Sequence, residues 1–226
     1  MPQGTNAVKS FIPVARIADL LLNPGATFTY AGETHTYPDI KLVYWAGGNP
    51  FHHHQDLNRL RRAWQRPETI VANEQYWTPA AKHADIVLPA TMFLEHDDFY
   101  TASGHTFFQV TKKVVEAPGE CRENHWVISE LAKRLGAKHR GFDMTAWEIM
   151  DEALKVSGMW DAETNWQKGG QDFHLGFETS HFLDGFAWPD KKFRFKPDWK
   201  AYGPRGAEMP ALPDHFDVID SATTIR

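Results

Sequence analysis

Residues 42 to 50 read Leu-Val-Tyr-Trp-Ala-Gly-Gly-Asn-Pro, an apolar run that ends in two glycines. A short β-branched and aromatic run between turn residues is typical of a strand buried on both faces. Gly47 and Gly48 allow positive φ and a close approach of a ligand to the main chain. Asn49 adds a side-chain amide and Pro50 stiffens the exit. We therefore predict a buried strand followed by a loop that can bind a phosphate.

The residues after this loop continue the pattern of a parallel α/β fold. Residues 55–66 place apolar side chains at helical spacing, and 69–72 form a second short apolar run that ends on Asn73 and Glu74. A third apolar run at 85–89 completes the strand and helix order βαβαβ. The predicted fold class is α/β, a Rossmann-like βαβαβ unit with a mostly parallel sheet.

Glu74 stands where dinucleotide-binding folds carry a functional carboxylate. In those folds an acidic residue about 20 residues past the glycine loop accepts hydrogen bonds from ribose hydroxyls. Glu74 follows Gly48 by 26 residues, and Thr78 before Pro79 is typical of a helix N-cap. The loop lacks the Gly-x-Gly-x-x-Gly fingerprint, so an ordinary turn that binds no ligand stays open on this pattern alone.

Three strings of the sequence resemble the molybdopterin oxidoreductases of the dimethyl sulfoxide reductase family. They are Tyr-Trp-Ala-Gly-Gly-Asn-Pro-Phe-His-His-His-Gln-Asp at 44–56, Ala-Asp-Ile-Val-Leu-Pro-Ala-Thr at 84–91 and Phe-Leu-Glu-His-Asp-Asp at 93–98. The likeness is greatest to the branch of the trimethylamine N-oxide and biotin sulfoxide reductases. It extends from the region of Ile12 to that of Gly136.

The resemblance implies that this segment contacts one of two molybdopterin guanine dinucleotides. The contacts to its phosphate, ribose or guanine would come from Gly47, Gly48, Asn49, His53, Asn73, Glu74, Thr78, His96 and Asn124. His96 stands where relatives often carry arginine, and Asn124 where they often carry aspartate. Histidine and asparagine keep a hydrogen-bonding group at these positions but lack the formal charge that arginine and aspartate carry at neutral pH.

The resemblance also implies what lies outside this chain. The domain with the protein ligand of molybdenum and the C-terminal domain that completes both dinucleotide sites are not recognisable here. We expect a middle segment, inactive by itself, of an enzyme that reduces S-oxides or N-oxides by oxygen-atom transfer. Its partners would be the remaining domains or subunits and the small-molecule oxide. The alternative is a non-catalytic nucleotide-binding or interaction module that kept the fold after losing its neighbours.

The sequence divides into a Rossmann-like dinucleotide-binding segment, residues 1–156, and an irregular, aromatic-rich extension toward a missing C-terminal domain, residues 157–226. The first segment is therefore expected to be an incomplete domain. Beyond the βαβαβ unit, periodicity and turn residues predict further helices at 14–22, 126–135 and 145–156 and a hairpin at 27–37.

Composition excludes several classes of function. The formal net charge of −5 offers no basic footprint for nucleic acid, and no apolar run approaches the roughly 18 residues of a membrane span. Cys121 is the single cysteine, which excludes an internal disulfide and a cluster held by several thiolates of this chain. The compartment, cytoplasmic or periplasmic, stays open.

Three other chemistries are less well supported than the dinucleotide site. Residues 52–54 are three consecutive histidines, whereas zinc sites on helices use positions i and i+4. Glu95, Asp97 and Asp98 could form an acid/base pair but fit better as caps of a turn. Cys121 fits better as an inert thiol on a surface loop than as a redox group.

Overall fold

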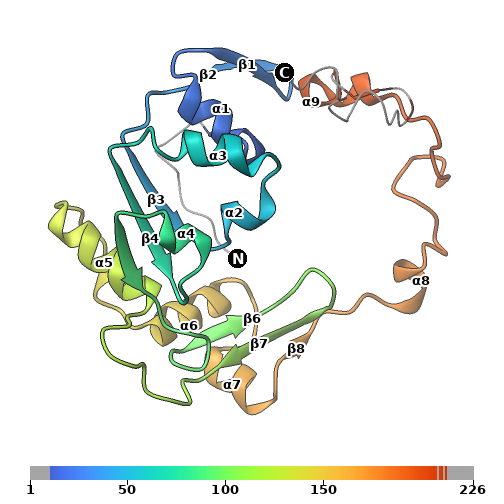
Figure 1. Ribbon diagram of the computed structural model, residues 1–226. Coiled ribbons are helices and arrows are strands. Elements are labelled where there is room, and N and C mark those ends of the chain that lie inside the picture. The colour runs from blue at the N-terminus through green and yellow to red at the C-terminus, as the bar shows by residue number, and fades with distance from the viewer. Residues whose placement is uncertain (1–10, 208, 211, 213–226) are drawn as a thin grey trace. The chain divides into compact units, whose positions relative to one another are not determined.

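The computed structural model describes residues 11–207, 209–210 and 212 and shows a mixed α/β protein (Figure 1). The described chain forms two compact units. Unit 1 comprises residues 11–22 and 40–174, and unit 2 comprises 23–39 and the described part of 175–212. Residues 1–10 and 213–226 of the two predicted domains lie outside the described residues.

A three-stranded parallel sheet forms the centre of unit 1. Its strands are β3 (Leu42–Ala46), β4 (Thr69–Glu74) and β5 (Ile86–Pro89), in the order β3-β4-β5. The register pairs Val43 with Ile70, and Val71 with Ile86. The predicted run of strands and helices is therefore present, and its three strands are parallel.

The prediction that the first strand is buried on both faces is wrong. Leu42 is 57% exposed, and the middle of β3 is only half-buried. Among the described strands β3 pairs only with β4, so it lies at a sheet edge. Val43 and Trp45 pack against the helical core, while the alternate residues belong to the opposite face of the strand. One covered face explains the partial burial.

Short helices cover one face of this sheet. A 3₁₀ turn (Val14–Arg16) leads into α1 (Ile17–Leu22), which packs on α3 (Leu57–Ala63). The core between helices and sheet is built from Leu21, Phe51, Leu60, Ala63, Trp64, Ile70 and Ala80. The ion pair between Arg59 of α3 and Asp19 of α1 adds a polar link at the margin.

The predicted helix at 55–66 is present as the shorter α3, and a further short helix, α2 (Pro50–His53), precedes it. Asp56 interrupts them with a left-handed backbone, φ +45°. Its carboxylate accepts a hydrogen bond from Arg59 N at 3.0 Å, so it caps α3. Helical spacing alone could not reveal this restart, because the apolar residues of both helices share one core. Helix α4 (Pro79–Lys82) has Thr78 as N-cap, as predicted.

An antiparallel sheet and three helices complete unit 1. The strands are β6 (Asp98–Tyr100), β7 (Phe107–Thr111) and β8 (Gln171–Asp172), in that order. Helices α5 (Asn124–Arg134) and α6 (Ala146–Val156) match the predicted helices, and α7 (Ala162–Gln167) packs on β7. A capping box between Thr145 and Glu148 starts α6. A 3₁₀ turn (Arg140–Phe142) lies between α5 and α6.

Unit 2 contains the predicted hairpin, β1 (Thr27–Tyr30) paired with β2 (Glu33–Thr36). Phe28 stacks on Tyr37 with 4.5 Å between the ring centroids. The same unit contains α8 (Phe177–Ser180), a 3₁₀ turn (Trp199–Tyr202) and α9 (Pro204–Ala207). Since α7 and β8 belong to unit 1, that unit includes the chain as far as residue 174. The predicted domain boundary at residue 156 stays a prediction.

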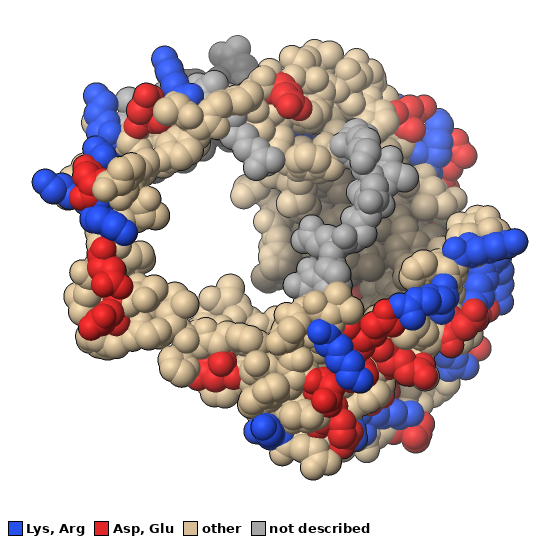
Figure 2. Space-filling model, turned by 180° about the vertical axis from the view of Figure 1, so that it is seen from behind, with Lys and Arg blue, Asp and Glu red and all other residues tan. Residues whose placement is uncertain are grey.

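The surface of the described chain carries both signs of charge. On the face that Figure 2 presents, basic and acidic side chains lie interspersed. Among the described residues, no helix combines the length and the apolar character that a membrane crossing needs.

Asn165 is the polar group on which the packing of α7 against β7 depends. Its side chain is fully buried, accepts a hydrogen bond from Val110 N at 2.8 Å and donates one to Phe108 O at 3.3 Å. We expect Asn165→Leu to lower the free energy of unfolding by about 2 to 4 kcal/mol, because two buried backbone groups lose their partner. Urea denaturation measures the change. Gln167→Ala, an exposed position of the same helix, is the control and should stay within about 0.5 kcal/mol.

Candidate functional site

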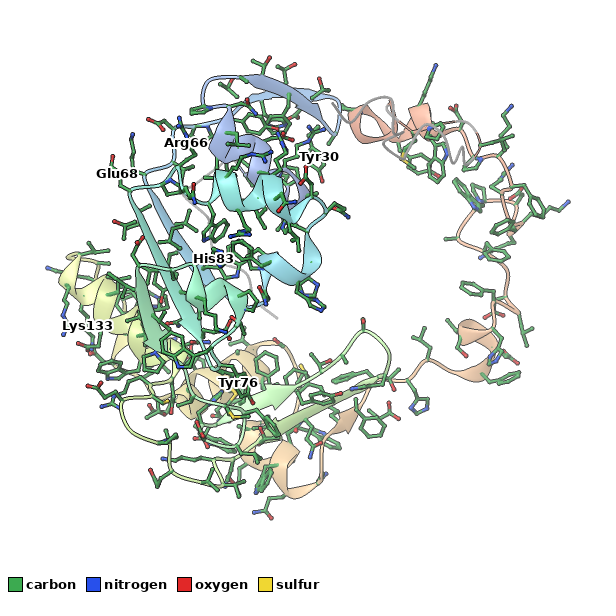
Figure 3. The ribbon with its side chains drawn as sticks, in the orientation of Figure 1. Tyr30, Arg66, Glu68, Tyr76, His83 and Lys133 are labelled. Carbon is green, nitrogen blue, oxygen red and sulfur yellow. The ribbon has the colours of Figure 1, made fainter. Side chains whose placement is uncertain are left out.

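The carboxyl ends of the three parallel strands meet at one edge of the sheet. The register places Ala46 beside Asn73, and Asn73 beside Leu88. The loop after β3, the turn after β4 and the residues after β5 are therefore neighbours. Figure 3 labels Glu68 before β4 and Tyr76 after it, at the two ends of the sheet. Ligands of open α/β sheets bind at the carboxyl edge.

The loop after β3 has the open backbone that its glycines predict. Gly47 and Gly48 adopt φ of +79° and +66°, and a Cβ built on either would meet no atom within 4 Å. Trp45 Nε1 donates a hydrogen bond to Gly48 O at 3.1 Å and fixes the loop on its own strand. Asn49 Oδ1 caps α2 by accepting from Phe51 N at 3.1 Å. The loop is thus held from within while its outer side stays accessible.

A cavity of about 480 Å³ lies against this loop. That volume is within the range of small-molecule sites. Four of the predicted contacts, Gly47, Gly48, Asn49 and His53, share the cavity, and the other residues that line it are Val14, Ala15, Trp45, Pro50, His54 and Gln55. His54 and Gln55 could have been proposed from their place beside His53. Val14 and Ala15 are distant in sequence, and only the tertiary structure brings them here.

Aromatic rings support the loop from the core side. Trp64 makes edge contacts with Trp45 and with Phe51, whose centroids lie 5.4 and 5.5 Å away. The ring of His83, labelled in Figure 3, stacks on Phe51 at 4.1 Å. Such contacts contribute beyond the burial of the rings alone. The cavity wall is therefore backed by closely packed side chains.

Asn73, Glu74 and Thr78 form a second group, at the end of β4. The Glu74 carboxylate accepts hydrogen bonds from Thr78 Oγ1 at 2.8 Å and from Gln75 N at 3.0 Å. Glu74 is thus part of the turn that starts α4. Because a carboxylate has about four acceptor positions, it keeps capacity for a ligand.

His96 and Asn124 form a third group and line a cavity of about 280 Å³. His96 Nδ1 lies 2.9 Å from Thr91 Oγ1, and its Nε2 lies 3.4 Å from the Asp98 carboxylate. Asn124 Oδ1 accepts a hydrogen bond from Asn73 Nδ2 at 2.7 Å, which joins the third group to the second. Asn73 Oδ1 is buried and has no partner among the described residues.

The structure therefore collects the nine predicted residues at the carboxyl edge as three adjoining groups, not as one cavity. Sequence spacing could not separate these groups, because their grouping depends on the direction of each side chain. Thr91, which lies within hydrogen-bonding distance of His96, was not predicted as a site residue. Its only indication in the sequence is that it ends the family-like string at 84–91.

The other clusters behave as structural groups. Glu95 accepts a hydrogen bond from Met92 N at 2.9 Å, which fits the predicted turn cap, whereas Asp97 accepts one at 2.9 Å from Lys113 N, on a segment distant in sequence. Cys121 is a half-buried free thiol. Within the part of the chain that the structure describes, no three His, Cys, Asp or Glu residues are grouped as metal ligands.

Comparison with known proteins decides the family. Residues 3–134 match the family model of the molybdopterin oxidoreductases. This chain belongs to the molybdopterin oxidoreductase family. The family predicted from the three strings is confirmed, while the nine contact residues stay predictions.

The relatives of this molybdopterin oxidoreductase chain are larger proteins. Biotin sulfoxide reductase of Cereibacter sphaeroides is 43% identical over 180 residues, which are 75% of this chain and 24% of that protein. The dimethyl sulfoxide/trimethylamine N-oxide reductase of the same organism is 45% identical over 67% of this chain and 18% of its own length. Trimethylamine-N-oxide reductase of Haemophilus influenzae is 49% identical over 58% of this chain and 16% of its own length. The chain spans about a quarter or less of these relatives.

A solved structure shares the fold. Acetylene hydratase from Pelobacter acetylenicus superposes with a TM-score of 0.59 and 22% sequence identity, over 79% of this chain and 24% of that chain. The mixed α/β arrangement is therefore a fold that occurs within a larger polypeptide.

Gly48 tests the strain in the loop. We expect Gly48→Ala to lower the free energy of unfolding by about 1 to 2 kcal/mol, because an L-residue is disfavoured at positive φ. Gly104→Ala is the matched control: its Cβ also meets no atom within 4 Å, but its φ is not positive. That variant should be neutral or slightly more stable. Equal melting curves for the two variants would remove the strain argument.

His54 gives the cavity a pH-dependent contribution to stability. Burial lowers the pKa of His54 from its ordinary value of 6.5, and the neighbouring His53 lowers it further. The unfolded chain then takes up the proton at a higher pH than the folded chain, so this contribution is complete above about pH 6.5 and is lost as the pH falls below it. We expect His54→Gln to flatten the fall in unfolding free energy between about pH 7 and 5. Denaturation at several pH values measures the slope, and an unchanged slope contradicts the prediction.

Proposed function

We propose that this chain holds part of a molybdopterin guanine dinucleotide in an oxidoreductase that reduces S-oxides or N-oxides by oxygen-atom transfer. The observation that carries the proposal is the open glycine loop and its 480 Å³ cavity at the carboxyl edge of the parallel sheet. Family membership and the names of the relatives support it. The Rossmann-like βαβαβ interpretation of this segment is part of the same proposal.

The loop fits the phosphate region of such a group. Gly47 and Gly48 leave room where a Cβ would stand, so phosphate oxygens can approach the main chain. Asn49 and His53 line the same cavity and offer side-chain hydrogen bonds. The cavity has the volume for a part of the dinucleotide, and the adjoining groups would hold the rest.

Glu74, which accepts a hydrogen bond from Thr78, would also accept hydrogen bonds from ribose hydroxyls. The Thr78 hydroxyl orients the carboxylate, and the register of the sheet brings the end of β4 beside the glycine loop. Asn73 adds a buried oxygen with unmet hydrogen-bonding capacity. These features favour a polar ligand along this edge.

His96 and Asn124 would contribute hydrogen bonds near the same ligand rather than fixed charges. Thr91 and Asp98 orient the imidazole, and Asn73 orients the Asn124 amide. In this proposal the arginine and aspartate of relatives are replaced by groups whose orientation is set by the protein.

In the parent enzyme the cofactor would be bis-molybdopterin guanine dinucleotide with molybdenum, which supplies the redox chemistry of oxygen-atom transfer when bound. The part of this chain is to bind and orient one nucleotide. The remaining domains or subunits would supply the metal ligand and the rest of both dinucleotide sites. Residues 1–156 would form the dinucleotide-binding segment, and 157–226 the extension toward the C-terminal domain.

Glu74 provides the sharpest test of this function. We expect Glu74→Gln to weaken cofactor retention in the assembled enzyme by roughly 10- to 100-fold, because a hydrogen bond to a charged group contributes about 1.5 to 3 kcal/mol. The measurement is molybdenum and guanine nucleotide per mole of protein. Glu68→Gln is the matched control, since Glu68 is an exposed carboxylate at the opposite end of β4.

A thermal melt of each variant separates cofactor loss from unfolding. The proposal predicts that cofactor content falls in Glu74→Gln at temperatures where the variant remains folded, and that Glu68→Gln retains the cofactor. Unchanged cofactor content in Glu74→Gln would contradict the assignment of Glu74. An assembled enzyme with neither molybdenum nor guanine nucleotide would contradict the function itself.

A further inference from the structure

Helix α5 leaves most of its apolar side chains in solvent. Trp126, Ile128 and Leu131 are 49%, 46% and 41% exposed, and Leu135 at its C-cap is 77% exposed. Ser129 is the one buried residue of the helix. Helices in proteins gain most of their stability by packing an apolar face. The apolar face of α5 is therefore only partly covered by the part of the chain that the structure describes.

Three of these exposed residues form a stripe along one side of the helix, whereas Trp126 lies on the opposite side. Ile128, Leu131 and Leu135 are spaced i, i+3 and i+7, the spacing of one helical face. The stripe extends for about 10 Å at the rise of an α-helix. An apolar surface of this length suits an elongated occupant.

A cavity of about 310 Å³ adjoins the stripe between α5 and α6. Ile128 belongs to both, and Val156 on the α6 side is 66% exposed. The apolar lining comes from Ile128, Phe142, Met144, Ile149, Ala153 and Val156. Stripe and cavity, called the α5–α6 groove below, together resemble a surface that receives the apolar face of a helix.

The charged groups near this groove already have partners. Arg140 pairs with Glu152, and Lys133 pairs with Asp143 at 2.7 Å. Hydrogen bonding to Asp143 raises the pKa of Lys133. Lys133, labelled on α5 in Figure 3, is thus engaged within unit 1. Recognition at the groove would therefore rest on apolar contact rather than on charge.

The length of the relatives indicates what supplies the occupant. This chain matches 24% of the biotin sulfoxide reductase and 16% of the Haemophilus influenzae trimethylamine-N-oxide reductase. About three quarters of such a polypeptide lies outside the matched segment. We propose that the α5–α6 groove receives an apolar-faced helix from the remaining polypeptide of the parent oxidoreductase. This inference rests on the proposed function, because it requires that parent.

Cysteine labelling tests the proposal directly. In a Cys121→Ser background, Leu131→Cys and Leu135→Cys report on the groove, and Glu68→Cys is the exposed control in the same unit. We expect the maleimide reaction at 131 and 135 to be slower by roughly tenfold or more in the assembled enzyme than in the isolated chain, because docked surface is protected. The control position should react at a similar rate in both samples.

A charge placed in the groove gives a second, independent reading. Leu131→Glu should reduce assembly by roughly tenfold or more, because an unpaired carboxylate would be buried in an apolar contact. Its melting temperature as an isolated chain should change little, since Leu131 is 41% exposed. Arg134→Gln, a polar exposed position on the same helix, should assemble normally.

The outcomes separate this inference from the proposed function. Equal labelling in chain and assembled enzyme, or normal assembly of Leu131→Glu, overturns the docking proposal even if the enzyme contains molybdenum. Protection of the isolated chain that increases with its concentration assigns the groove to a second copy and also overturns it. Molybdenum and guanine nucleotide content, measured in the same samples, reports on the function independently.

Discussion

The parallel pairing of β3, β4 and β5 is the constraint on which the rest of unit 1 depends. Parallel strands require crossovers, and the short helices α2, α3 and α4 provide them. The register then fixes which residues share the carboxyl edge, with Ala46 beside Asn73 and Glu74 beside Pro89. A shift of one residue would send every side chain of the shifted strand to the opposite face. The positions of the first two site groups follow from this register, and the hydrogen bond between Asn73 and Asn124 joins the third group to them.

The glycine loop leaves its outer side open to solvent, while side chains of the core hold its inner side in place. Trp45 connects the core to the loop, because its ring packs on Trp64 and its indole Nε1 donates a hydrogen bond to Gly48 O. Phe51, the second residue of α2, fills the same aromatic cluster and is stacked on His83. In the proposed function, this support would order the loop before a ligand arrives and so lower the entropic cost of binding.

Helix α5 links the proposed cofactor site to the proposed docking groove. Its first residue, Asn124, orients the Asn73 amide, and its exposed apolar stripe begins one turn later at Ile128. A helix with a single buried residue has little of its own packing to fix it. Under both proposals, docking of the remaining polypeptide on α5 would also steady the Asn73–Asn124 pair and so connect the proposed groove to the proposed cofactor site.

The sequence by itself determined the local features of this protein. Short apolar runs separated by glycine, asparagine and proline define the strands and turns, because backbone preferences act over a few residues. Thr78 before Pro79 and Thr145 before Glu148 are caps for the same reason. The three strings around the loop and the third strand were specific enough to identify the family, which the match over residues 3–134 confirms.

Only the tertiary structure decided which features meet. The half-exposure of β3 depends on what covers each face of the sheet, and the left-handed Asp56 that divides α2 from α3 depends on how both helices reach one core. The hydrogen bonds of Glu74 with Thr78 and of Asn73 with Asn124 form only because the folded chain points these side chains toward one another. Val14 lines the loop cavity although it is distant in sequence from the loop. Apart from the Glu74–Thr78 bond, which spans four residues, these are long-range contacts whose free energy comes from packing and burial, and a local pattern of residues does not encode them.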